Sequence, residues 1–346
     1  MNSTLWPKVL LQYFQGLLKW EDRLYLLVPW GQDMVMKVLQ WHKVEPTARE
    51  LHLSMPSRPC PEYHSIFEEE RMRHFFKEEI VFRQLNEIEE AFRKDQLEFM
   101  VLKGLFWGEQ VYPTALWRHL GDIDLLVRPE SRQTALQTLL QLGYRMESEG
   151  FSLEEALSPL RGGTTVIYPG KEHGRRTSVS LHWKPLHSAR FMRRLQIETE
   201  DLFSYTTWAN FRGLELLLPR PEVRFGYLVV HNICHHQLKR FLQLMDMAHL
   251  LRRHPQFDFD FLIDLVRKWE AMISLYFALK ALWLFGFQEG RCLEFLERLE
   301  RVMPWRVRLF VTALSPTRML HSYSRKGNYT RKIMRVLASE PLQVNV

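Results

Sequence analysis

The chain has 346 residues, of which 46% are hydrophobic, 25% charged and 13% aromatic. This composition is typical of a folded protein with about two domains, and it excludes a disordered chain, a collagen-like fibre and a disulfide-stapled miniprotein. The three cysteines, Cys60, Cys234 and Cys292, are widely spaced and form no CxxC pair. We therefore expect a reducing, cytoplasmic location and no cysteine-rich zinc site.

The net charge of +7 is concentrated near the C-terminus. From residue 301 to residue 346, nine basic side chains stand against one acidic side chain, Glu340, whereas the first 300 residues carry 38 basic and 39 acidic side chains. Such a segment attracts an anionic partner, for example nucleic acid, a phospholipid surface or an acidic protein. The alternative is that these charges form the solvated face of the last helices.

No segment has the pattern of a secretory signal or a membrane span. The N-terminus lacks a basic region followed by a long apolar core. The most apolar stretch, 271–287, is interrupted by Lys280 and is shorter than the roughly 20 residues of a span, so it predicts a buried helix.

Residues 1–95 are predicted to be helical, with a loop at 55–61. The clearest helix is 66–94, because apolar residues there recur at helical spacing and Glu–Arg pairs lie four residues apart. From 96 to 218 the pattern changes to short apolar runs and turns. The expected strands are 99–102, 122–127, 166–168, 179–183 and a pair within 203–218, and the expected helices begin at Gly104 and Pro129.

From Pro221 to about residue 338 the helical pattern returns. The predicted fold class is therefore α+β, with a mixed β-sheet domain flanked by an N-terminal and a C-terminal helical region. The predicted boundaries are 1–95, 96–218 and 219–346, the last region carrying the basic segment.

Asp122 and Asp124 are the strongest local indication of chemistry. On the predicted strand 122–127, side chains two residues apart point to the same face, so both carboxylates project together. Like charges raise each other's pKa unless a cation lies between them, and Mg²⁺ binds carboxylate oxygens together with substrate phosphates. Such a pair can also end a strand or face solvent, so spacing alone leaves both interpretations open.

Lys103 and Gly104 end one predicted strand and begin a helix, where free backbone N–H groups and the helix dipole can receive a phosphate. Asp122 follows Gly104 by eighteen residues, and Arg118 precedes Asp122 by four as a second candidate phosphate contact. A strand–glycine–helix element followed by a strand-borne DxD is the arrangement of a polymerase-β-like nucleotidyltransferase.

Several motifs carry a more specific resemblance. The segment VLKGLFWGEQVYPTALWRHLGDIDLLVRPESRQTALQTLLQLGY at 101–144 resembles the signature of the uncharacterised, minimal-type nucleotidyltransferases. WHKVEP at 41–46 is similar to that family's N-terminal HxVxP turn, and LHW at 181–183 to its histidine–tryptophan strand. His231, His235 and Asp246, in VVHNICHHQLKRFLQLMDMAHLL at 229–251, resemble its histidine and aspartate helices. In this order the motifs cover about 40–250.

Ser180 departs from the family pattern, which implies an acidic residue at this position. That third carboxylate would activate the attacking hydroxyl. Ser180 and His182 share one strand face, but serine is a poor Mg²⁺ ligand. Three alternatives stay open: His182 acts as the base, an acid such as Glu172 or Glu147 replaces the missing group, or the enzyme is weakened or inactive.

His231 and His235 lie four residues apart on a predicted helix, which is also zinc-ligand spacing. No glutamate follows His231, so the hydrolytic HExxH motif is absent. The pair is interpreted as buried structural histidines, bonded through Asp246 for example, as substrate or nucleotide contacts, or as a metal site.

The resemblance implies a Mg²⁺-dependent nucleotidyltransferase. It would move a nucleoside monophosphate from a nucleoside triphosphate, with ATP the first candidate, to a hydroxyl or phosphate on a small molecule or peptide, and release pyrophosphate. Asp122 and Asp124 would hold the metal and form the catalytic group with His182. The residues expected to contact the nucleotide are Lys103, Gly104, Arg118, Ser180, His231 and His235.

Two other functions stay open at this stage. One is a catalytically degenerate protein of the same fold that binds a nucleotide or a partner, which the serine at position 180 favours. The other is an RNA-directed transferase that uses the basic C-terminal segment, although no RNA-binding motif supports it.

Overall fold

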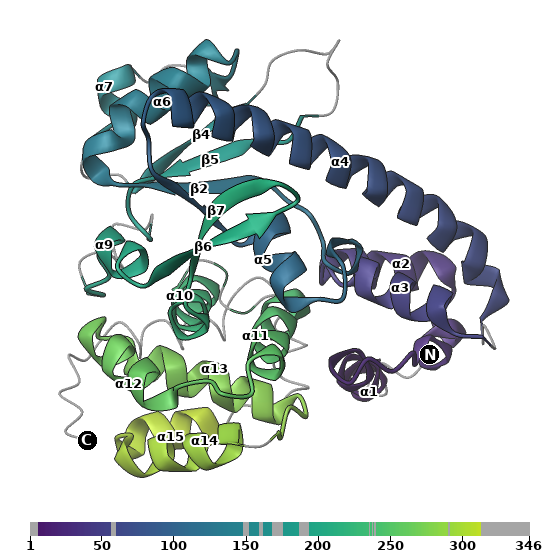
Figure 1. Ribbon diagram of the computed structural model, residues 1–346. Coiled ribbons are helices and arrows are strands. Elements are labelled where there is room, and N and C mark those ends of the chain that lie inside the picture. The colour runs from purple at the N-terminus through teal and green to yellow at the C-terminus, as the bar shows by residue number, and fades with distance from the viewer. Residues whose placement is uncertain are drawn as a thin grey trace. The chain divides into compact units, whose positions relative to one another are not determined.

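The computed structural model describes residues 6–56, 60–147, 152–158, 162–167, 176–186, 194–234, 236, 238, 240–289 and 291–312. The chain forms two compact units, one of residues 70–224 and one that combines 1–69 with 225–346. The first contains a mixed β-sheet and the second is helical (Figure 1). The α+β class is confirmed, whereas the three-part division at 95/96 and 218/219 stays a prediction.

The sheet of the first unit has seven strands in the order β3-β4-β5-β2-β1-β7-β6. Strand β2 pairs antiparallel with β1 and parallel with β5, while β1 pairs parallel with β7. The strands are β1 (Phe99–Leu102), β2 (Ile123–Val127), β3 (Arg145–Met146), β4 (Gly163–Ile167), β5 (Val179–His182), β6 (Thr206–Phe211) and β7 (Leu214–Pro219). Every residue of β1, β2 and β5 is buried; the apolar runs of β1 and β2 predict this, whereas β5 also buries Ser180 and His182.

Short helices connect these strands. They are α5 (Gly104–Val111), α6 (Arg132–Gln141), α7 (Leu153–Ala156), α9 (Thr199–Phe203) and the 3₁₀ turns η4 (Ala115–Trp117) and η5 (Pro129–Ser131). Helix α6 ends before Gly143, whose φ of +90° favours glycine. The predicted pairing of 166–168 with 179–183 is confirmed by the antiparallel β4–β5 register, and the residues expected to form the turn lie outside the described residues.

The helical unit is built from amphipathic and fully apolar helices, with short 3₁₀ turns in its N-terminal part. Its described elements include α1 (Trp6–Leu18), η1 (Leu24–Leu26), η2 (Val28–Trp30), α2 (Gln32–Trp41), α3 (Glu45–Ser54), α11 (Phe241–Arg253), α12 (Phe259–Lys268), α13 (Met272–Leu284), α14 (Arg291–Val302) and α15 (Trp305–Thr312). Helix α10 (Pro221–Cys234) begins at the end of the sheet unit. The apolar stretch at 271–287 forms the buried helix α13, and no helix in the described ranges is long and apolar enough to cross a membrane.

The short η3 turn (Pro61–Tyr63) leads into the long helix α4 (His64–Lys94), which is fixed to the sheet through Gln84. The Gln84 side chain, only 1% exposed, donates from Nε2 to the Tyr144 hydroxyl and to the Thr177 carbonyl, both at 2.7 Å. Its oxygen accepts the Thr177 backbone N–H at 3.1 Å. Because Thr177 lies just before β5, these bonds fix where β5 begins.

Replacing Gln84 with alanine should lower the free energy of unfolding by about 2 kcal/mol, because the half-buried Thr177 backbone and the buried Tyr144 hydroxyl each lose hydrogen bonds to a buried side chain. Asn86→Ala on the same helix removes only an exposed hydrogen bond to Glu90 and should change the free energy of unfolding by less than about 0.5 kcal/mol. Urea unfolding of both variants measures the difference, and equal losses would show that Gln84 is not an anchor.

Candidate active site

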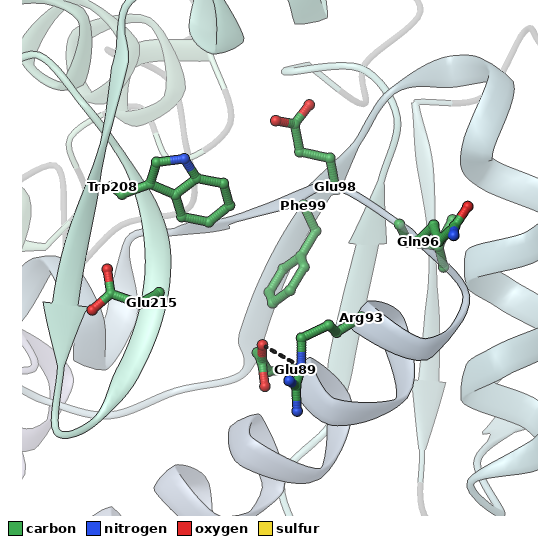
Figure 2. Close-up of a pocket in the computed structure, with 8 residues that line it drawn as sticks. Glu89, Arg93, Gln96, Glu98, Phe99, Trp208 and Glu215 are labelled. Carbon is green, nitrogen blue, oxygen red and sulfur yellow. Dashed lines mark ion pairs between the residues drawn. The ribbon is translucent and has the colours of Figure 1, made fainter.

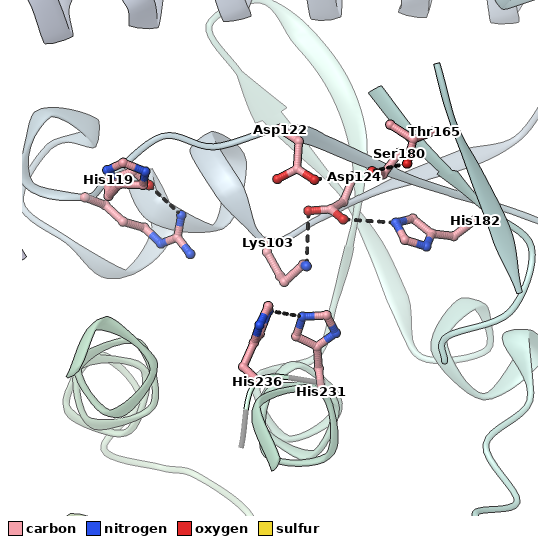
Figure 3. A network of polar contacts seen from close by, with 10 residues as sticks. Lys103, His119, Asp122, Asp124, Thr165, Ser180, His182, His231 and His236 are labelled. Atoms are coloured by element: carbon pink, nitrogen blue, oxygen red, sulfur yellow. Dashed lines mark hydrogen bonds and ion pairs between the residues drawn. The ribbon is translucent and has the colours of Figure 1, made fainter. Parts of the chain in front are cut away.

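The two aspartates lie where β2 begins. Asp122 precedes the strand and is exposed, while Asp124 is 7% exposed and is in register with Leu102 of β1 and Ser180 of β5. Ser180 Oγ donates to Asp122 Oδ2 at 3.2 Å, and His182 Nε2 lies 2.9 Å from Asp124 Oδ1 (Figure 3). The shared strand face of Asp122 and Asp124, and that of Ser180 and His182, are therefore confirmed.

Lys103 reaches the same cluster from the β1–α5 turn. Its Nζ lies 3.1 Å from Asp124 Oδ2, so that the ammonium and the His182 ring take opposite oxygens of one carboxylate (Figure 3). The Lys103 backbone has φ +60° and ψ −149°, a region that essentially only glycine adopts, and Gly104 follows with φ +60°. A non-glycine residue held in this region costs about 1–3 kcal/mol and is found mainly at functional sites.

The Asp124 carboxylate is a stabilised buried charge. Burial alone would raise its pKa, but the Lys103 charge and the His182 hydrogen bond outweigh burial and hold the pKa well below its usual range. Asp124 is therefore ionised at neutral pH. The Asp124 carboxylate is thus already ionised in the folded protein, and a buried anionic carboxylate is suited to bind a cation.

Ser180 occupies the position from which β5 would present a third carboxylate. It is directly opposite Asp124 in the strand register, and its hydroxyl lies 3.4 Å from the Thr165 hydroxyl of β4. Within the described ranges, no cluster of three or more His, Cys, Asp or Glu side chains could hold a metal ion. The two aspartates supply the hard oxygen donors that Mg²⁺ prefers, although both Asp124 oxygens contact protein side chains here.

Lys77 of α4 belongs to this region and was not predicted. Its Nζ donates to the Leu120 carbonyl at 2.6 Å. Burial lowers the pKa of Lys77 below its ordinary value and outweighs the nearby Asp122 charge, which raises it. The Thr177 hydroxyl also donates, at 2.9 Å, to the Gly121 carbonyl. These bonds fix the backbone before Asp122. Lys77 lies in a helix with many charged residues, and nothing in its local pattern marks it.

Arg118 lies four residues before Asp122, on the segment that leads into β2. Arg118 packs its side chain over α5, where a Cβ on Gly108 would come within 3.1 Å of Arg118 Cδ, and its Nη1 donates to the His119 carbonyl at 3.1 Å.

Glu147 donates its backbone N–H to the Thr165 carbonyl of β4, and Thr165 is paired with Ser180 of β5. The Glu147 backbone is therefore two strand spacings, about 10 Å, from the Ser180 backbone. The role of Glu147 as a substitute for the missing carboxylate stays a prediction, and Glu172 lies outside the described residues.

The histidine helix belongs to the helical unit. His231 of α10 is buried, stacks on Tyr227 and contacts His236, with 3.0 Å between the two Nε2 atoms. His235 lies outside the described residues, so the predicted His231–His235 pair is not described. Asp246 is buried on α11.

A separate pocket of about 480 Å³ lies at the other end of β1, since Phe99 pairs with Val127 while Leu102 pairs with Asp124. Its most exposed aromatic side chain is Trp208 of β6, 63% exposed, which extends over the pocket among acidic side chains (Figure 2). The lining residues are Glu89, Arg93, Gln96, Leu97, Glu98, Phe99, Trp208 and Glu215. No motif in the sequence indicated this pocket.

The mixed sheet with helices at both ends of the chain is consistent with a nucleotidyltransferase-type domain. Residues 30–285 match a family described as uncharacterised nucleotidyltransferase, which is most of the chain. The protein therefore belongs to this family, as its motifs predicted, and at the coarse level of enzyme class the family indicates a transferase. No curated protein matches the chain.

Replacing Lys103 with methionine should lower the free energy of unfolding at pH 7 by about 3 kcal/mol, because the buried Asp124 charge loses its cationic partner. Without Lys103 the pKa of Asp124 rises, so the carboxyl takes up a proton as the pH falls. The neutral carboxyl no longer carries the free-energy cost of an unpaired buried charge. The stability difference from wild type should therefore narrow between pH 7 and about pH 4.

Lys103→Arg, which retains the charge in the same backbone conformation, is the matched control and should lose less stability. Chemical denaturation at several pH values measures all three proteins. A loss that is the same at every pH would mean that Lys103 acts through packing alone.

Proposed function

We propose that the protein transfers a nucleoside monophosphate from a nucleoside triphosphate to an acceptor hydroxyl or phosphate on a small molecule or peptide, releasing pyrophosphate. The observation that carries this proposal is the position of Lys103: its ammonium lies 3.1 Å from Asp124, and its backbone forms the turn before α5. Two carboxylates and a cation at a strand–glycine–helix turn suit a phosphate chain and its counter-ion.

Lys103 and Gly104 would seat the triphosphate. A phosphate chain gives the Lys103 ammonium new oxygen partners, and the first N–H groups of α5 lack intrahelical acceptors. When Lys103 turns to a phosphate, Asp124 Oδ2 becomes available. Arg118 lies on the segment before Asp122 and would balance further phosphate charge.

Asp122 and Asp124 would hold Mg²⁺, which when bound supplies charge neutralisation at the phosphates and the leaving pyrophosphate. Their carboxylate oxygens fit a hard cation, and Asp122 is the more exposed of the two. ATP is the first candidate for the triphosphate.

His182 acts as a positioning residue in this proposal. Its Nε2 contacts Asp124 and its ring is buried, so an acceptor hydroxyl has little access to it as a base. Phosphoryl transfer depends mostly on positioning and electrostatic stabilisation. A site without the third carboxylate can therefore retain activity, since the base is the smaller part of the catalysis.

Asp122→Asn together with Asp124→Asn should weaken binding of Mg²⁺–ATP by about ten-fold or more, because the negative donors are lost while side-chain size is kept. Isothermal titration with each triphosphate in the presence of Mg²⁺ measures the affinity. Glu154→Gln, which neutralises an exposed carboxylate of the same unit, is the control and should bind like wild type. Unchanged affinity in the double variant would remove the aspartates from the site.

A second candidate function is a catalytically degenerate protein that binds a nucleotide or a partner. The Ser180 hydroxyl, 3.2 Å from Asp122, favours this alternative because a neutral hydroxyl stands where a carboxylate would be a charged metal ligand. The two functions differ in whether a carboxylate at position 180 improves catalysis.

Ser180→Asp should destabilise the metal-free protein, because the new carboxylate would adjoin Asp122, and Mg²⁺ with ATP should restore the thermal midpoint. Ser180→Asn, similar in size and uncharged, should respond to Mg²⁺ like wild type. If pyrophosphate release increases in Ser180→Asp, the protein is an enzyme of reduced activity. A variant that neither gains activity nor responds to Mg²⁺ indicates a binding protein.

A further inference from the structure

Helix α15 of the helical unit has two opposite apolar faces. Val307 and Val311 are 2% exposed and pack into the unit, whereas Trp305 and Leu309 are 62% and 63% exposed. With about 100° per residue, Trp305 and Leu309 lie on one side of the helix and the two valines lie on the other. Large apolar side chains thus form a ridge directed to solvent.

Arginines flank this ridge. At the same helical spacing, Arg306 and Arg308 fall on either side of the line from Trp305 to Leu309, and both are exposed. The Arg306 guanidinium lies 5.5 Å from the centre of the Trp305 ring. The sequence from 301 onward carries nine basic residues and one acidic residue. The ridge is therefore apolar at its centre and cationic at both margins.

We propose that this face of α15 binds an anionic phospholipid surface. Helices that lie in the membrane interface combine tryptophan and leucine on one face with lysine and arginine beside them. Acidic lipid headgroups attract each nearby basic residue. The position of Leu309 favours lipid over nucleic acid, because an aliphatic side chain gains from acyl chains and offers no stacking surface to a base. This proposal does not rest on the proposed transferase function.

The experiment is flotation of the full-length protein with phosphatidylcholine vesicles, with and without phosphatidylserine. Wild type should bind in the presence of phosphatidylserine and only weakly without it, and added salt should reduce binding. Trp305→Ala with Leu309→Ala should weaken binding about ten-fold or more. Arg306→Gln with Arg308→Gln should weaken it about thirty-fold on the anionic vesicles alone.

Trp208→Ala is the matched control, because Trp208 is equally exposed, at 63%, but lies beside Glu98 and Glu215 (Figure 2). It should bind vesicles like wild type, and circular dichroism checks that all variants remain folded. The proposal is overturned if the ridge variants bind as wild type does, which would show that this face of α15 takes no part in binding. It is also overturned by equal binding to neutral vesicles, or by RNA that binds in preference to the vesicles.

Discussion

The buried charge of Asp124 is the constraint on which the centre of this sheet depends. A carboxylate on a buried strand is unfavourable unless partners supply opposite charge and hydrogen bonds. Lys103 does so from the turn that follows β1, and His182 from β5, each contacting a different carboxylate oxygen. The strand order and the register of these three strands are therefore the structural conditions for an ionised group at this position.

The same arrangement explains how folding and function compete here. Lys103 stabilises the metal-free protein by its contact with Asp124, yet in the proposed reaction it must exchange that contact for a phosphate. Its backbone strain is maintained by the surrounding sheet and by α5. Lys77 and Gln84 on α4 fix the chain before β2 and β5, so that the cluster is supported from outside the strands.

The sequence predicted the strands and the shared face of Asp122 and Asp124 because both follow from local rules. Apolar runs define buried strands, and a period of two defines their faces. The Lys103–Asp124 contact was beyond such rules, because it depends on the antiparallel register of β1 with β2. Lys77 was missed for a related reason: in a helix rich in charge, spacing does not show which ammonium contacts the sheet.

The most direct test of the central claim is to follow two phosphate labels of the nucleoside triphosphate. Purified protein, Mg²⁺ and a pool of cellular small molecules and peptides are incubated with triphosphate labelled at the α- or the γ-phosphate. Nucleotidyl transfer predicts that the α-label enters an acceptor while the γ-label leaves in pyrophosphate, and that Asp124→Asn abolishes both. Appearance of the γ-label in an acceptor or as orthophosphate, with the α-label left in a nucleoside diphosphate, would contradict the account.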